Sequence, residues 1–120
     1  MSRRLTHSLR VYRKRSGLSQ REAGFLLGVK HGGKISRYEN RRRIPPLRTA
    51  LAYATILNVP LPQLFPHLQR EVQAEVAGRI LDLQAKIAAA EKRKRGSRRA
   101  ARMIEWLKER HAGITITKSP

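Results

Sequence analysis

The side chains in this chain that are best suited to chemistry are arginines and lysines, and several of them fall within one short segment. Lys34 and Arg37 are three residues apart, so on a helix they lie one turn apart on the same face. Arg41–Arg43 follow shortly after them. A guanidinium presents paired donors that match a phosphate, or the O6 and N7 atoms of guanine. This spacing predicts binding of anions, and of nucleic acid in particular.

The other reactive residue types do not form a catalytic or metal-binding pattern. The chain has no cysteine, which excludes disulfides and thiolate metal sites. Asp82 is the only aspartate, and no nucleophile, base and orienting group cluster in the sequence. We therefore expect a protein that is not an enzyme and that carries no metal or cofactor. The four histidines are scattered, without the spacing of metal ligands: His7, His31, His67 and His111.

Net charge is the strongest global signal. The 120 residues include 27 lysines and arginines against 8 aspartates and glutamates, which gives a formal charge of +19. Glu22 and Glu39 are the only acidic residues before Pro66. Such a chain attracts polyanions, with nucleic acid the leading candidate and an anionic membrane surface the lesser one. The most apolar stretch, Ala50–Leu57, is too short to span a bilayer, so we expect a soluble, cytoplasmic protein.

Short helices are expected to position these cations. Ser19 is a strong N-cap residue, and Glu22 three residues later completes a capping-box pattern. The helix that follows is expected to end at Gly28, and the helix before it at Ser16 and Gly17. Apolar spacing predicts that the helix before Ser19 begins at Leu5. It also predicts further helices that cover Ile35 and Tyr38, that extend from Pro46 to Asn58, and that form one turn from Leu61 to Phe65.

A different pattern follows Pro66. Apolar residues recur every three or four positions from Leu68 to Ile87, which predicts a long helix with one apolar face. Ser97 is expected to cap a last helix that Gly113 ends. The apolar face needs a partner, either the last helix folded back as a hairpin or a second chain. We therefore expect a domain at 1–66, a helical extension at 67–112 and a flexible tail at 113–120.

An ordered set of motifs connects Leu9 to Phe65: "GLSQ" before the second helix, "ISRYEN" in the third, and "PPLRTALAYATILNV" through the fourth. In this set and its spacing the segment resembles the helix-turn-helix DNA-binding domain of the Cro and phage-repressor (XRE-type) family. The resemblance implies an all-α, five-helix domain whose third helix enters the major groove. It also implies that Arg13 and Glu39 form a mostly buried ion pair, so we assign both to structure rather than to DNA contact.

Two departures from the family pattern stand out. Family members usually have a larger residue and then alanine where this chain has Ala23 and Gly24. They also usually have four residues where this chain has five, Lys30–Lys34. We expect Gly32 and Gly33 to absorb the extra residue in a lengthened turn, so that the third helix begins late. The bare backbone there either approaches DNA closely or is only a flexible linker, and the sequence leaves both open.

The resemblance also assigns candidate DNA contacts. Arg37 is expected to read a base, whereas Lys34 and His31 are equally suited to a base or a phosphate. Ser36 reaches the groove or caps locally. The start of the second helix offers N–H groups to a phosphate. The full set of candidates is Ser19, Gln20, Lys30, His31, Gly32, Gly33, Lys34, Ser36, Arg37, Asn40, Arg41, Arg42 and Arg43.

The sequence as a whole predicts a sequence-specific, double-stranded DNA-binding transcriptional regulator. We expect a dimeric repressor, because a symmetric dimer reads paired half-sites. One alternative is an antitoxin-type DNA-binding protein whose C-terminal helices grip a partner protein. Another is a charge-driven RNA- or nucleoid-binding protein. The basic run Lys92–Arg99 either touches flanking DNA or forms a solvated hinge. We expect a nucleoid-associated location and no membrane partner.

Overall fold

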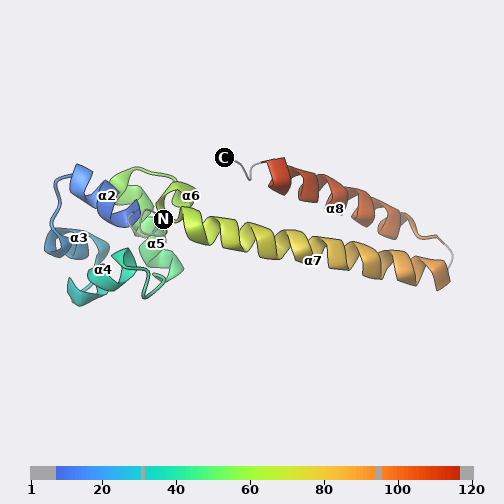
Figure 1. Cartoon of the computed structure of the whole chain (residues 1–120), viewed down its shortest axis with the longest axis horizontal. Coiled ribbons are helices and arrows are strands. Elements are labelled where there is room, and N and C mark those ends of the chain that lie inside the picture. The colour runs from blue at the N-terminus through green and yellow to red at the C-terminus, as the bar shows by residue number, and fades with distance from the viewer. Residues whose placement is uncertain (1–7, 31, 94–95, 117–120) are drawn as a thin grey trace. The chain divides into compact units, whose positions relative to one another are not determined.

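The computed structural model describes residues 8–30, 32–93 and 96–116, and these residues form helices and their connections without any strand (Figure 1). The chain divides into two compact units, residues 1–69 and 70–120, which are considered separately below. Within the described ranges, no helix combines the length and the apolarity needed to cross a membrane.

The first unit is a bundle of short helices, as expected from the sequence. Its described part contains five of them before Pro66, which confirms the all-α class and the predicted number. α3 packs against both α4 and α5, α2 packs against α4 and α6, and α5 packs against α6. The helices are α2 (Ser8–Arg15), α3 (Gln20–Leu27), α4 (Gly32–Glu39), α5 (Leu47–Leu57) and α6 (Leu61–Leu64).

The core of this unit is built from five buried residues on four of the helices. Ile35 on α4 is fully buried, and the rings of Tyr38 and Tyr53 meet edge to face, with centroids 6.3 Å apart. Leu9 from α2 and Leu64 from α6 complete the cluster. Because these residues lie at helical spacing in the sequence, burying them fixes which faces of α2, α4 and α5 point inward.

In the first unit, the predicted helix ends at glycine and asparagine are confirmed. Gly17 after α2 and Gly28 after α3 adopt left-handed backbone, with φ of 81° and 77°. Asn58 caps α5 in the same conformation, with φ of 57°. Left-handed backbone is strained for most side chains but open to glycine and tolerable for asparagine, so the sequence placed these stops correctly.

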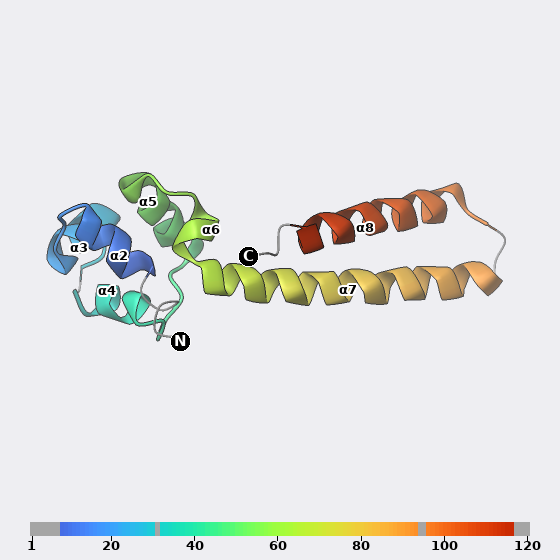
Figure 2. The ribbon, with the colours of Figure 1, turned by 45° about the horizontal axis from the view of Figure 1, so that its top comes forward.

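The second unit is formed by most of α7 (Pro66–Arg93) and by α8 (Arg98–Ile116). α8 runs back alongside α7 as a hairpin (Figures 1 and 2). Ile80 on α7 and Leu107 on α8 are buried, at 7% and 3% exposure. In this structure the chain's own last helix therefore covers part of the apolar face of α7.

The helix boundaries in the C-terminal part differ from expectation at Pro66 and at Gly113. Pro66 follows α6 and also begins α7, which is possible because a first-turn residue needs no N–H partner within the helix. Gly113 does not end the last helix, since α8 continues to Ile116. That prediction was wrong because an interior glycine costs a helix about 1 kcal/mol without terminating it. The expected tail at 113–120 thus begins with helical residues, and 117–120 lie outside the described residues.

Candidate nucleic-acid interface

The helix that carries the predicted base contacts begins earlier than expected. Gly32 and Gly33 do not form a lengthened turn ahead of Lys34, because α4 includes both glycines. Gly33 does not have a positive φ, and a Cβ added to it would meet no atom within 4 Å. The prediction was wrong because glycine permits a left-handed turn without requiring one, and first-turn N–H groups need no partner within the helix. The first turn of α4 therefore presents nearly bare backbone.

α4 has one face locked into the bundle and one face open. Ile35, Tyr38 and Glu39 point inward, with exposed fractions of 0%, 6% and 2%. This inward register is the one that the sequence predicted, and it leaves the opposite face free of packing. That open face presents the exposed Gly33, Arg37 and Asn40, with the half-buried Lys34 and Ser36 beside them.

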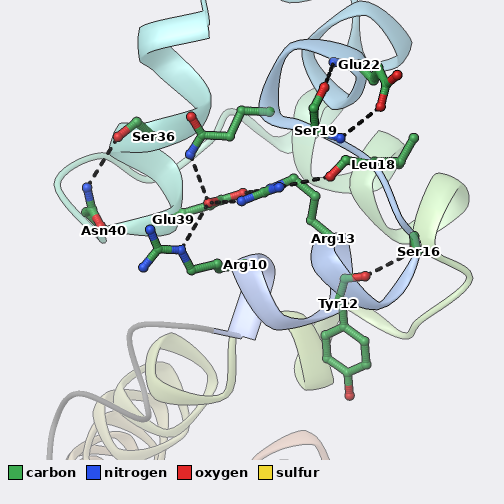
Figure 3. Close-up of polar contacts among 11 residues, drawn as sticks. Arg10, Tyr12, Arg13, Ser16, Leu18, Ser19, Glu22, Ser36, Glu39 and Asn40 are labelled. Carbon is green, nitrogen blue, oxygen red and sulfur yellow. Dashed lines mark hydrogen bonds and ion pairs between the residues drawn. The ribbon is translucent and has the colours of Figure 1, made fainter.

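Two polar residues at the end of the open face are neighbours. Asn40 Nδ2 donates to Ser36 Oγ across 3.4 Å, which is a weak hydrogen bond (Figure 3). Asn40 N–H also donates to the Ser36 carbonyl at 2.9 Å. The sequence left open whether Ser36 reaches outward or acts locally. In the unbound chain it acts locally, through a bond weak enough to exchange for a bond to a ligand.

α4 ends in an unusual way. The N–H of Arg42 donates to the Arg37 carbonyl at 2.9 Å, and the N–H of Arg41 donates to the Tyr38 carbonyl at 3.1 Å. This is the Schellman pattern of a helix C-terminus. Its left-handed position is occupied by Arg41, with φ of 62°, whereas the ends of α2 and α3 use glycine there. An arginine in this conformation costs roughly 1 kcal/mol relative to glycine, so the fold alone favours a different residue.

The arginines after α4 are directed to solvent. Arg41, Arg42 and Arg43 are all exposed. Within the described part of the chain, none of these three forms an ion pair. Together with Arg37, they extend the open face of α4 and form a cationic surface whose charges have no acidic partner among the described residues.

The start of α3 has the predicted capping box. Ser19 Oγ accepts a hydrogen bond from the Glu22 N–H at 3.0 Å, and Glu22 Oε1 accepts one from the Ser19 N–H at 2.9 Å (Figure 3). The two reciprocal bonds fix where α3 begins. They leave the next backbone N–H groups of the first turn, including that of Gln20, available to an anion.

The side chain of Gln20, a predicted phosphate contact, makes a hydrogen bond within the domain in the unbound chain. Its Nε2 donates to Glu39 Oε1 at 3.1 Å, and the residue is half-buried. The amide therefore joins the start of α3 to the end of α4. Sequence reasoning missed this contact because the two residues are 19 positions apart, and no periodic pattern relates them.

The predicted ion pair between Arg13 and Glu39 is present and buried. Arg13 Nε donates to Glu39 Oε2 at 2.5 Å, and Nη2 donates to Oε1 at 3.1 Å (Figure 3). The third donor, Nη1, bonds to the Leu18 carbonyl at 2.9 Å. The hydrogen bond to Glu39 raises the pKa of Arg13 above its ordinary value. With exposed fractions of 7% and 2%, the pair belongs to the interior, so the structural assignment is confirmed.

Two further residues surround this carboxylate. Arg10 lies one turn before Arg13 on α2, and its Nε is 4.0 Å from Glu39 Oε1. The buried hydroxyl of Tyr53 has no hydrogen-bond partner within the described part of the chain. Burial raises the pKa of Tyr53, and the negative charge of Glu39 adds to that rise. Arg10 was not predicted from the sequence, although its helical spacing from Arg13 is a signal that could have pointed to it.

The structure thus brings most of the predicted contacts to two neighbouring places, the open face of α4 with its following turn and the start of α3. Lys30 is exposed in the connection between α3 and α4. His31, another predicted contact, lies outside the described residues. Within the described ranges, no group of three or more His, Cys, Asp or Glu residues could hold a metal ion. Exposed cations beside free backbone N–H groups can bind a phosphate backbone and read base edges.

Comparison with known proteins points to the same segment. A family model described as a helix-turn-helix domain matches residues 4–68, which is more than half of the chain. That family lies within the XRE/Cro-type helix-turn-helix group. No curated protein and no solved structure gives a significant match to the chain.

Proposed function

Because the chain belongs to the helix-turn-helix domain family, whose members bind DNA, we propose that it is a sequence-specific transcriptional regulator that acts as a dimeric repressor. The observation that carries this proposal is the register of α4. Ile35, Tyr38 and Glu39 hold one face rigidly inside the bundle, so Arg37 on the other face is presented in a fixed direction. A fixed reading side chain is what recognition of one base pair requires.

Arg37 is the proposed base-reading residue. It is exposed on the open face of α4, and its guanidinium can donate to both O6 and N7 of a guanine. Lys34 is half-buried at the edge of that face, which suits a phosphate or a base at the groove wall. Gly33, without a side chain, lets the first turn of α4 lie close to the DNA.

Phosphate contacts are proposed on both sides of this helix. On one side, Arg41–Arg43 follow α4 as exposed cations. On the other side, Ser19 and the backbone N–H of Gln20 begin α3, where the helix dipole favours an anion. Such contacts hold the register of the domain on the duplex but carry no sequence information themselves.

The dimeric state is proposed from the hairpin of the second unit. Val72, Val76, Leu83 and Trp106 remain between 38% and 54% exposed although α8 covers part of α7. Two hairpins that pair through these side chains would remove them from water and would place two reading helices on one DNA. Sedimentation equilibrium of the full chain tests this part of the proposal, because a mass of one chain at micromolar concentration contradicts it.

Selection of bound sequences from a pool of random duplexes tests the proposal as a whole. We expect the parent chain to enrich one motif with two-fold symmetry, whereas a charge-driven binder enriches none. The variant Arg37→Ala should lose preference at one base pair in each half-site and lose about 1–3 kcal/mol of binding energy on the best duplex. If its selected motif equals that of the parent and only the affinity falls, Arg37 contacts phosphate and the assignment is wrong.

A further inference from the structure

Charge is distributed unevenly along the hairpin of α7 and α8. In residues 70–82 of α7 and 105–116 of α8, cations and anions alternate, and the two signs nearly balance. Between Leu83 and Ile104, by contrast, Glu91 is the only acidic residue. We define the hairpin tip as the five exposed cations on either side of the turn, leaving out residues 94–95, which lie outside the described residues: Lys92, Arg93, Arg98, Arg99 and Arg102.

The one acidic residue between Leu83 and Ile104 already has a hydrogen-bonding role. Glu91 is half-buried, and its Oε1 accepts a hydrogen bond from the Ser97 N–H at 3.0 Å. Ser97 in turn caps α8, since its Oγ accepts from the Ala100 N–H at 3.2 Å. Glu91 thus closes the connection between the helices. None of the tip cations forms an ion pair with another described residue.

This arrangement works against the stability of the hairpin itself. Arg98 and Arg102 are four residues apart on α8, where like charges destabilise a helix. If the connection between α7 and α8 only had to face water, uncharged polar residues would serve as well as Arg98 and Arg102. Several of the described positions beside these cations carry alanine, with Ala88–Ala90 on α7 and Ala101 on α8, and such short side chains leave room for an extended anion.

The chemistry of the hairpin tip fits a phosphate backbone better than a membrane surface. Three of its five cations are arginines on α8, and guanidinium groups match phosphate oxygens in pairs. Insertion into a membrane surface requires large apolar side chains beside the charges. Four of the exposed large apolar residues of the hairpin lie away from the tip, at Val72, Val76, Leu81 and Leu83. Trp106 lies one turn beyond Arg102, and the Arg110 guanidinium is 5.8 Å from the centroid of its ring.

We propose that the hairpin tip is a second binding site for duplex DNA, which contacts the phosphate backbone without reading sequence. The inference rests on the proposed function, because DNA held by α4 raises the local concentration of phosphates that the tip meets. α7 has 28 residues and is therefore about 42 Å long. That length corresponds to roughly 12 base pairs of duplex, so the tip can add contacts beyond those of a single half-site.

Two matched variants of the full chain test this site. The tip variant carries Arg98→Gln, Arg99→Gln and Arg102→Gln. The control variant carries Arg70→Gln, Arg79→Gln and Lys108→Gln, which removes the same charge from exposed positions of the same two helices. Affinity is measured against salt concentration on a duplex that carries the selected motif with about 20 base pairs on each side. Circular dichroism of each variant establishes that the hairpin keeps its helices.

The tip variant should bind this duplex at least about tenfold more weakly than the parent at moderate salt, with a salt slope smaller by up to about 2.7 units. The control variant should stay within about twofold of the parent, because its cations lie among acidic residues. A further variant with lysine at the same three tip positions should retain most of the binding, because the charge is kept. If the tip variant does not fold, a variant with Lys92→Gln and Arg93→Gln removes tip charge from α7 instead and should also bind more weakly than the parent.

Three results would overturn the proposal. Equal losses in the tip and control variants would mean that only the net charge matters. Parental affinity of the tip variant would mean that the tip is a solvated turn. Loss of binding to phosphatidylserine vesicles with no loss on DNA would assign the tip to a membrane. The tip and control variants are also compared on an unrelated duplex, which does not depend on the proposed function. If the parent chain selects no motif, sequence-specific binding is contradicted, but this second comparison still tests the tip.

Discussion

Gln20 at the start of α3 is hydrogen-bonded to Glu39 at the end of α4, with 3.1 Å between Nε2 and Oε1. The same carboxylate accepts two hydrogen bonds from Arg13 on α2. One buried acidic group therefore ties together the two helices of the helix-turn-helix pair and the helix beneath them. Because the pair binds as a rigid unit, the position of the start of α3 relative to the open face of α4 depends on this carboxylate.

Replacing Gln20 with alanine tests this connection. We expect Gln20→Ala to lower the free energy of unfolding by about 1 kcal/mol, because a half-buried hydrogen bond to a charged group is lost. DNA binding should weaken to a similar extent on every duplex. Arg21→Ala, at an exposed position one residue along, is the control for stability. Weaker binding with an unchanged urea midpoint would show instead that the Gln20 side chain contacts phosphate directly.

Alanine should raise the stability of the fold at both glycines of the helix-turn-helix pair. Gly33→Ala and Gly24→Ala should each stabilise the fold by up to about 1 kcal/mol, since both positions are helical. A Cβ at Gly24 would lie 3.5 Å from the Val29 carbonyl oxygen and 3.6 Å from Ile35 Cγ1, which are ordinary contacts. Thermal unfolding measures both effects. Destabilisation by Gly33→Ala would contradict the helical position of Gly33 and would support the lengthened turn that the sequence predicted.

The same pair of variants separates folding from DNA contact. Gly24 lies inside the bundle, so its alanine variant should bind DNA as well as the parent. Gly33 lies on the open face, and we expect Gly33→Ala to bind the selected duplex more weakly although it is more stable. Unchanged affinity of Gly33→Ala would mean that the bare backbone does not approach the DNA.

Replacing Arg41 with glycine should make the fold more stable and DNA binding weaker. Its left-handed backbone favours glycine, so Arg41→Gly should raise the free energy of unfolding by roughly 1 kcal/mol. It should also flatten the dependence of log affinity on log salt by about one unit, because one phosphate contact is lost. Arg42→Ala is the matched control, which should flatten the slope equally without the gain in stability. A salt slope of Arg41→Gly equal to the parent's would remove Arg41 from the phosphate contacts.

Alkaline pH should destabilise the first unit through Tyr53. The pKa of Tyr53 is raised in the fold by burial and by the charge of Glu39, whereas the unfolded value is about 10. Folding therefore favours the neutral, protonated hydroxyl of Tyr53. Its contribution to stability is complete below pH ~10 and falls as the pH rises above that value.

Tyr53→Phe provides the test of this pH dependence. The variant should show a shallower loss of unfolding free energy above pH ~10 than the parent, as measured by urea titrations at several pH values. Near neutral pH it should be at least as stable, because the buried hydroxyl lacks a partner among the described residues. Tyr12→Phe is the control on α2. Identical pH profiles of parent and Tyr53→Phe would place the hydroxyl in contact with water.

Features that depend on local backbone chemistry could be predicted from the sequence. The Ser19–Glu22 capping box needs only residues three positions apart, and the stops at Gly17 and Gly28 need only a residue that tolerates positive φ. Helical spacing likewise predicted which residues of α4 point inward. The Arg13–Glu39 pair was available only through resemblance to a family, because nothing local relates residues 26 positions apart.

Other features were decided by the tertiary structure. The sequence allowed Gly32 and Gly33 to form either a turn or a helix, and their place in α4 depends on how α3 and α4 pack. Arg41 has no intrinsic preference for left-handed backbone, so only the completed end of α4 places it there. The hydrogen bond from Gln20 to Glu39 requires both helices to be assembled. Local preferences act within a few residues of the chain. These three features depend instead on which helices pack against each other, and residues far apart in the sequence determine that packing.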